Sequence, residues 1–118
     1  MTFLQRNYTK ILKKTNPKFK IIDVREPREF VDHHIKGSKQ VSYYNIEDWA
    51  TQLKDTELTD SYIFVCSRTG RSLRAASIAK KLGIENVFVL AGGTAAWSAK
   101  GFDRVLPNSC LPNNKPVL

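Results

Sequence analysis

The fold of this chain is decided by one stretch, residues 62–72, whose sequence is YIFVCSRTGRS. The short apolar run that opens it, bounded by polar residues, is typical of a buried β-strand. A helix is predicted over residues 71–82, because apolar side chains recur there at helical spacing, at Ala75, Ile78, Ala79 and Leu82. Gly83 follows as the expected C-terminal cap. The stretch therefore predicts a strand, a tight loop and a helix, with Cys66 where the strand ends.

A junction of this kind is a binding site for anions. The first N–H groups of a helix have no backbone partners, and the helix dipole favours negative charge there. The same field stabilises a thiolate. The segment adds positive charge through Arg68, Arg71 and Arg74, and residues 61–84 contain no acidic side chain. We therefore interpret Cys66 as a reactive nucleophile. The alternative, a small buried hydrophobe, fits the polar and cationic surroundings less well.

Length and composition favour a single domain. A chain of 118 residues has room for one core. We place the domain at residues 1–106, with a basic helix in 1–18, the core motifs in 19–102 and an irregular tail at 107–118. Two cysteines do not make a disulfide framework, which suggests a reducing compartment. No stretch approaches a membrane span, so we predict a cytoplasmic protein. Cys110, in the tail, is interpreted as a bystander thiol, with a role in resolving a Cys66 persulfide as the alternative.

The net charge of +8 is concentrated near the N-terminus. Residues 1–20 carry six basic and no acidic side chains, which leaves only +2 for the rest of the chain. Such a helix could contact RNA, an acidic protein or a membrane surface. We favour a solvated helical face and expect no nucleic-acid partner, because no aromatic platform or known nucleic-acid motif accompanies the charge.

Apolar runs alternate with segments long enough for helices. The runs lie at 19–24, 41–44, 62–65 and 87–90, and the expected helices between them at 26–33, 46–53 and 71–82. A short edge strand, an amphipathic helix over 5–14 and a last short helix after Gly92-Gly93 complete the pattern. Strands that are apolar on both faces and alternate with helices indicate an α/β fold with a parallel sheet. Ligands of such sheets bind beyond the carboxyl ends of the strands, where Cys66 falls.

Four segments resemble the rhodanese domain in their order and spacing. They are IDVR at 22–25 with EF at 29–30, HIKGS at 34–38, CSRTGRS at 66–72, and GG with AW at 92–97. The resemblance covers roughly residues 19–102 and implies a rhodanese-like sheet of about five parallel strands with helices on both faces. It also implies a sulfurtransferase without cofactor or metal. Cys66 would take sulfane sulfur from thiosulfate or a persulfide donor and pass it, as a persulfide, to a thiol or protein acceptor.

The resemblance also assigns the substrate-binding residues to the loop, namely Ser67, Arg68, Thr69, Gly70, Arg71 and Ser72. Their N–H groups would hold the charge of the persulfide, and Arg68 and Arg71 would recognise an anionic donor. Asp23 and Arg25 are expected mainly to brace loops. His34 is expected to bond to backbone, because no metal-ligand spacing surrounds it. Gly92, Gly93 and Trp97 are expected to form a tight turn and a packing anchor beside the loop.

Loop length separates sulfur transfer from related chemistry. Four residues lie between Cys66 and Arg71, whereas the related phosphatases of the cell-division-cycle type have five. The shorter loop suits a sulfur atom better than a tetrahedral oxyanion, so a phosphatase or arsenate reductase is the lesser hypothesis. A sulfur-relay or regulatory binding module is the main alternative. Thr69 stands where many family members have glycine, so we expect the loop to differ in shape. The oligomeric state is left open.

Overall fold

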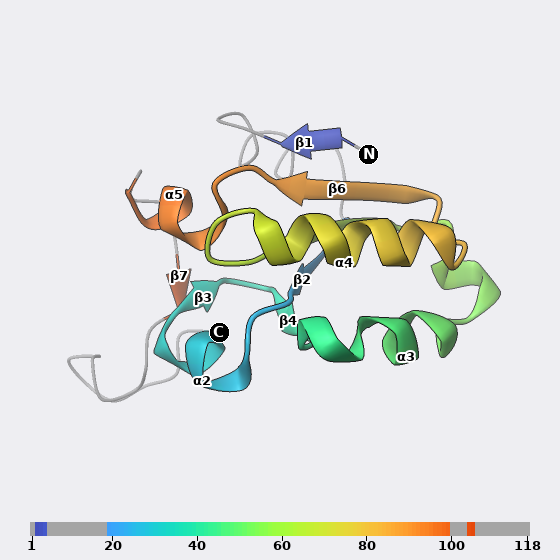
Figure 1. Ribbon diagram of the computed structural model, residues 1–118, viewed down its shortest axis with the longest axis horizontal. Helices are drawn as coiled ribbons and strands as arrows, with labels where there is room; N and C mark the ends of the chain where they lie inside the picture. Colours follow the sequence, from blue (N-terminus) through green and yellow to red (C-terminus); the bar gives the residue numbers. More distant parts are fainter. Residues whose placement is uncertain (1, 5–18, 100–103, 106–118) are drawn as a thin grey trace.

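The computed structural model describes residues 2–4, 19–99 and 104–105. Its centre is a sheet of five parallel strands in the order β1-β6-β5-β2-β4 (Figure 1). The strands are β1 (Thr2–Leu4), β2 (Phe19–Asp23), β4 (Lys39–Gln40), β5 (Ser61–Val65) and β6 (Asn86–Leu90). This arrangement confirms the α/β class, the predicted number of strands and the short edge strand before residue 5.

The middle of the sheet is apolar on both faces because β5 lies between β2 and β6. Ile21 and Ile22 of β2 stand opposite Ile63 and Phe64 of β5. Residues 62–65 are all buried, and Phe64 is fully buried. A parallel strand covered on both sides needs such a continuous apolar run, which explains why the sequence pattern identified it.

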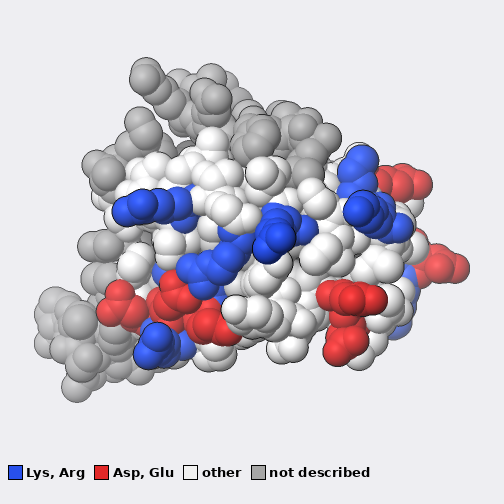
Figure 2. Space-filling view, in the orientation of Figure 1, with Lys and Arg blue, Asp and Glu red and all other residues white. Residues whose placement is uncertain are grey.

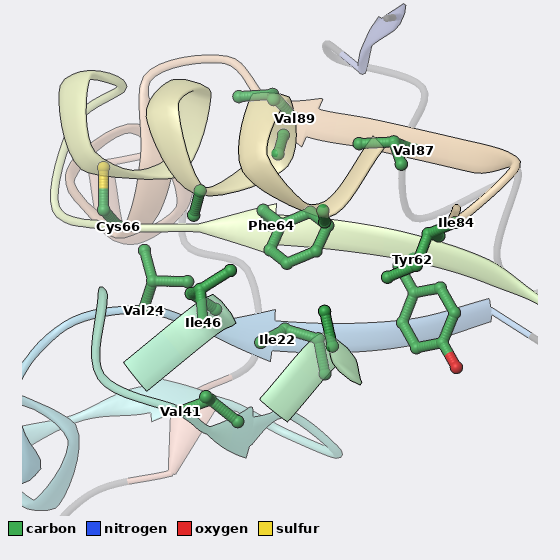
Figure 3. Packing of buried hydrophobic residues seen from close by; sticks show 14 residues of the cluster. Ile22, Val24, Val41, Ile46, Tyr62, Phe64, Cys66, Ile84, Val87 and Val89 are labelled. Carbon is green, nitrogen blue, oxygen red and sulfur yellow. The ribbon is translucent and has the colours of Figure 1, made fainter. Parts of the chain in front are cut away.

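Helices cover both faces of the sheet. Helices α3 (Ile46–Thr51) and α4 (Gly70–Lys81) lie over one face (Figure 1). Phe64 and Ile46 belong there to one apolar cluster (Figure 3), together with Ala75 and Ala79 of α4. Helix α5 (Gly93–Ala99) lies on the other face, where Trp97 belongs to a second apolar cluster. Fully burying a large aliphatic or aromatic side chain contributes roughly 1.5–3 kcal/mol, so these two clusters hold the layers together.

Three short elements lie near the carboxyl edge of the sheet. Helix α2 (Pro27–Asp32) follows β2, and β3 (His34–Ile35) pairs in antiparallel fashion with β7 (Arg104–Val105). Among the described residues this pair forms a second, two-stranded sheet, which the sequence did not predict. The 3-10 helix η2 (Asp55–Glu57) connects α3 to β5 at the opposite edge.

The prediction of a strand at residues 41–44 is wrong. Strand β4 ends at Gln40, and Tyr43–Asn45 form the 3-10 helix η1. The N–H groups of Val41 and Tyr43 still bond to carbonyls at the end of β2, Asp23 O at 2.9 Å and Val24 O at 2.9 Å. The backbone then turns, and the Asn45 N–H bonds to Ser42 O at 2.8 Å. The apolar run therefore marks burial of Val41 beside an edge strand and not a strand of its own.

The helix after Cys66 is close to its predicted bounds. Helix α4 ends at Lys81, and Gly83 adopts φ +108°, as expected of a C-terminal cap. The amphipathic helix predicted at 5–14, the domain end at 106 and the tail at 107–118 lie outside the described residues. No described helix is long and apolar enough to cross a membrane.

Basic and acidic side chains are intermixed on the face that carries α3 and α4 (Figure 2). They do not merge into one continuous basic surface on that face. The basic cluster of the first twenty residues lies almost wholly outside the described part of the chain, so the expected lack of a nucleic-acid partner stays a prediction.

Candidate active site at the end of strand β5

Cys66 directly follows the central strand β5. The preceding carbonyl, Val65 O, accepts a bond from Val24 N–H at 2.8 Å, which continues the pairing with β2 up to the cysteine. Cys66 is a free thiol with only 2% of its surface exposed. Its sulfur points from the strand end toward the first turn of α4 (Figure 3). The strand thus places the Cys66 thiol at the start of a helix, as the sequence predicted. Its role as a nucleophile stays a prediction.

Ser72 is the nearest polar partner of the cysteine sulfur. The Cys66 thiol donates to Ser72 Oγ at 3.3 Å, and the Ser72 hydroxyl donates to Thr69 O at 2.9 Å. Ser72 lies in the first turn of α4 and is fully buried. Because a hydroxyl can rotate, the same group can donate to the sulfur once the thiol has lost its proton.

Thr69 does not strain the loop. It is the N-cap of α4 with φ −145° and ψ −28°, so its β-branched side chain stands at a negative φ that such residues tolerate. Its Oγ1 accepts a hydrogen bond from Gly92 N–H at 3.2 Å. The residue that departs from the common family pattern therefore ties the loop to the turn after β6. The expected difference in loop shape stays a prediction.

The turn before α5 clamps the other side of the loop. Thr94 N–H donates to Cys66 O at 2.9 Å, and Ala95 N–H donates to Ser67 O at 2.9 Å. Gly93 makes this close approach possible, since it adopts φ +57° and a Cβ there would overlap Cys66 O. In a planar trans peptide the N–H points opposite to the C=O, so the N–H groups of Ser67 and Arg68 are directed away from α5. The predicted tight turn at Gly92-Gly93 is confirmed.

Glu29 is the functional neighbour that the sequence reasoning missed. The Arg71 guanidinium donates two bonds to its carboxylate, Nη1 to Oε1 at 2.8 Å and Nη2 to Oε2 at 3.0 Å. The Ser67 hydroxyl donates to Oε2 at 3.2 Å. The hydrogen bond from Arg71 lowers the pKa of Glu29 to about 2, and the same bond raises the pKa of Arg71. Glu29 lies on α2, 42 positions before Arg71 in the sequence, so the residues around the loop do not indicate this partner.

The three arginines at 68, 71 and 74 therefore differ in their partners. Arg71 is held by Glu29 and is not a free cation. Arg74 reaches the Tyr43 hydroxyl at 3.5 Å. Arg68 has an exposed side chain, and no bond links that side chain to another described residue. Arg68 is consequently the arginine of this segment most open to solvent, whereas Arg71 is already paired with Glu29. The expected role of both in recognising an anionic donor stays a prediction. Gly70, also expected in the site, is exposed at the start of α4.

Asp23 and Arg25 brace the neighbouring loop, as expected. Both side chains are buried, with exposures of 0% and 2%. Arg25 Nη2 donates to Asp23 Oδ2 at 2.8 Å and to His33 O at 2.6 Å, and Arg25 Nε donates to Asp23 Oδ1 at 3.0 Å. His34, also as expected, bonds to the backbone: its Nδ1 lies 2.7 Å from Phe30 O. These side chains position α2, and with it Glu29.

No group of three or more metal-ligating side chains occurs in the described ranges. Cys110, expected to be a bystander, and the basic side chains of residues 5–18, expected to form a solvated helical face, lie outside those ranges. Their expected roles stay predictions.

Relatives at the level of sequence include one named for sulfur transfer. The uncharacterised protein YqhL of Bacillus subtilis is 34% identical over 84 residues, which cover 70% of this chain and 64% of YqhL. The thiosulfate sulfurtransferase GlpE of Pseudoalteromonas translucida is 33% identical over 85 residues, which cover 72% of this chain and 78% of GlpE. The chain thus spans just under two thirds of YqhL and more than three quarters of GlpE.

Solved structures give the same fold. The rhodanese-like domain of Alr3790 from Anabaena matches with a TM-score of 0.81 and 25% identity, covering 95% of this chain and 85% of that one. RPA3614 of Rhodopseudomonas palustris, described as a possible tyrosine phosphatase, matches with a TM-score of 0.78 and 26% identity, covering 87% and 83%. A family model, the rhodanese-like domain, matches residues 6–100. That match covers most of the chain, and the chain therefore belongs to the family of rhodanese-like domains.

Proposed function

We propose that this protein is a sulfurtransferase that carries sulfane sulfur as a persulfide on Cys66. The observation that carries the proposal is the position of the Cys66 sulfur, at the end of the central strand and 3.3 Å from the Ser72 hydroxyl at the start of α4. The named activity of GlpE, at 33% identity, supports the same chemistry. A cytoplasmic location, predicted from the cysteine content, fits a thiol that must stay reduced.

The reaction consists of two displacements. The Cys66 thiol loses its proton to solvent, and the thiolate attacks the outer sulfur of thiosulfate. The S–S bond of thiosulfate breaks, and sulfite leaves with the bonding electron pair. An acceptor thiolate then attacks the outer sulfur of the Cys66 persulfide, and Cys66 leaves as a thiolate. The charge is the same before and after each step, so neither displacement needs an oxidant or a cofactor.

The loop after Cys66 stabilises the negative charge of the persulfide. N–H groups of residues 67–72 hold the charge of the persulfide, and the Ser72 hydroxyl turns from Thr69 O toward the sulfur. Arg68 binds the anionic donor and the leaving sulfite, because its exposed guanidinium is open to solvent. Asp23 and Arg25 act at a distance by holding the segment that carries α2.

The direct test is a mass measurement after incubation with thiosulfate. We expect a gain of one sulfur atom on wild-type protein, formation of thiocyanate when cyanide is added, and neither in Cys66→Ser. Cys110→Ser is the matched control because it removes the other cysteine of the chain, and it should keep the adduct. Full activity of Cys66→Ser would refute the proposal. Turnover of a phosphoester or of arsenate, without the sulfur adduct, would favour the phosphatase or arsenate reductase hypothesis instead.

A second candidate, a sulfur-relay module, is favoured by exposed apolar side chains on α4 and on two elements, α2 and η1, that contact the loop or α4. Val31 on α2 is 63% exposed, Tyr44 in η1 is 80% exposed, and Leu73 in the first turn of α4 is 38% exposed. Exposed apolar groups around a nucleophile suit a protein that delivers or accepts the sulfur. In this case Tyr44→Ser should slow transfer to a protein thiol but not to cyanide. Equal rates for wild type and variant with every acceptor would remove the reason for the relay.

A further inference from the structure

The carboxylate of Glu29 lies directly against the loop that follows Cys66. Both of its oxygens accept bonds from Arg71, at 2.8 Å and 3.0 Å, and Oε2 also accepts from the Ser67 hydroxyl at 3.2 Å. A bidentate pair of this kind fixes the plane of the guanidinium as well as its position. Arg71 is thereby held on one side of the loop.

Helix α2 places this carboxylate firmly. Glu29 lies in the first turn of α2, and its Oε1 also accepts a bond from Glu26 N–H at 3.1 Å. Glu26 in turn accepts a bond from the Ser42 hydroxyl at 2.7 Å. The side chain of Glu29 therefore has partners on α2, on the loop and on α4, and its position does not depend on a flexible surface contact.

The pairing changes the charge that a donor meets. Arg71 and Glu29 together contribute no net charge, so Arg68 is left as the uncompensated cation between Cys66 and the start of α4. The pKa of Glu29, about 2, keeps the carboxylate ionised at any pH at which sulfur transfer would be measured. A dianion loses roughly twice as much electrostatic attraction from this compensation as a monoanion does, because the Coulomb energy is proportional to charge.

We propose that Glu29 is a positioning residue that sets the donor preference of the site. It holds Arg71 at the loop, compensates the charge of Arg71 toward the donor, and so weakens the preference of the site for dianionic sulfane-sulfur donors over donors with one negative charge. The inference rests on the proposed sulfur transfer through Cys66. It assigns to Glu29 a role in specificity and not in the chemical step.

The test compares two donors that differ by one charge. Thiosulfate is a dianion, and methanethiosulfonate presents the same kind of outer sulfur on a monoanion. For Glu29→Gln, which keeps the shape and removes the charge, we expect the KM for thiosulfate to fall about tenfold and that for methanethiosulfonate about threefold, with kcat changed less than about twofold. The ratio of the two changes is the diagnostic quantity, because a merely structural role would affect both donors alike.

Asp32→Asn is the matched control. It removes one negative charge from the last residue of the same helix, where Asp32 is 74% exposed and bonds His33 and not the loop. Both KM values should stay within about twofold of wild type, since exposed charges are well screened. Equal changes with both donors in Glu29→Gln, or a rise in the KM for thiosulfate, would overturn the proposal.

Failure of the proposed sulfur transfer can be told apart from failure of this inference. In the Cys66→Ser background no persulfide can form, and binding of sulfate, also a dianion, can be titrated calorimetrically. Glu29→Gln should tighten sulfate binding about tenfold there, whatever the wild-type protein does with sulfur donors. An unchanged sulfate affinity would refute the role of Glu29 even if wild-type protein forms the persulfide.

Discussion

Gly93→Ala tests whether the contact between the α5 turn and the loop shapes the site. At Gly93 a Cβ would overlap Cys66 O and lie 2.5 Å from Arg68 O and 2.8 Å from the Ser67 carbonyl carbon. These are backbone atoms, so no side chain can rotate to relieve the contact. To make room, the turn must move away from the loop, and the bonds from Thr94 N–H and Ala95 N–H must lengthen.

The expected destabilisation has two parts. A left-handed backbone at φ +57° costs an alanine about 1–2 kcal/mol. Overpacking typically costs a further ~1–3 kcal/mol. The sum, about 2–5 kcal/mol, is a large fraction of the roughly 5–15 kcal/mol that stabilises a native domain. At about 4 °C for each kcal/mol, the midpoint of thermal unfolding should fall by about 8–20 °C.

Gly37→Ala is the matched control because it isolates the backbone cost. Gly37 also has a positive φ, +86°, but nothing lies within 4 Å of an added Cβ. The free energy of unfolding of the Gly37→Ala variant should therefore be lower than that of wild type by only about 1–2 kcal/mol. Circular dichroism during thermal and urea unfolding measures both variants, and persulfide formation at 20 °C below each midpoint reports the shape of the loop. If the two variants differ by less than about 1 kcal/mol, the steric account of Gly93 is wrong.

Three further predictions follow from the polar contacts. Ser72→Ala should slow persulfide formation on Cys66 about tenfold in single-turnover assays, since it removes one bond to the charged sulfur, and an unchanged rate would contradict the role of the hydroxyl. Arg25→Met leaves a buried carboxylate unpaired and should lower the free energy of urea unfolding by about 3–5 kcal/mol, whereas a loss below 1 kcal/mol would show that the pair is dispensable. The pKa of Glu29 is lowered from 4.5 to about 2 by Arg71, so its stabilisation is present above about pH 4.5 and is lost as the pH falls toward 2. Thermal midpoints should consequently fall more steeply over this range in wild type than in Glu29→Gln, and parallel curves would contradict the pairing.

Local patterns were sufficient for much of this fold. The run at residues 62–65 and the helical spacing after it placed β5, Cys66 and α4 within one residue of their observed bounds, because burial of a central parallel strand and of one helix face leaves a periodic signal. The apolar run at 41–44 wrongly predicted a strand, because Val41 is buried beside an edge strand whose pairing ends at Gln40. Apolar character reports burial, and burial alone does not distinguish a strand from a 3-10 turn.

The polar contacts of the site could be predicted only where the two partners are close in the sequence. Asp23 and Arg25 are two residues apart, so their pairing could be expected from their spacing after a strand. The pairing of Glu29 with Arg71 joins residues 42 positions apart and exists only because α2 and α4 begin at the same edge of the sheet. A motif containing Glu29 was visible in the sequence, but no local signal indicated which partner it would meet.

The sequence by itself determined the α/β class, the central strand, and the position of a cysteine at the start of a helix, because these depend on hydrophobic period and on neighbours along the chain. Only the tertiary structure decided that Glu29 pairs with Arg71 and that the Arg68 side chain stays exposed. It also decided that the turn at Gly93 packs against the backbone of the loop. The physical reason is that electrostatic and steric contacts act through space. The net charge of the side chains around the Cys66 loop is therefore set by elements that only the assembled sheet brings together.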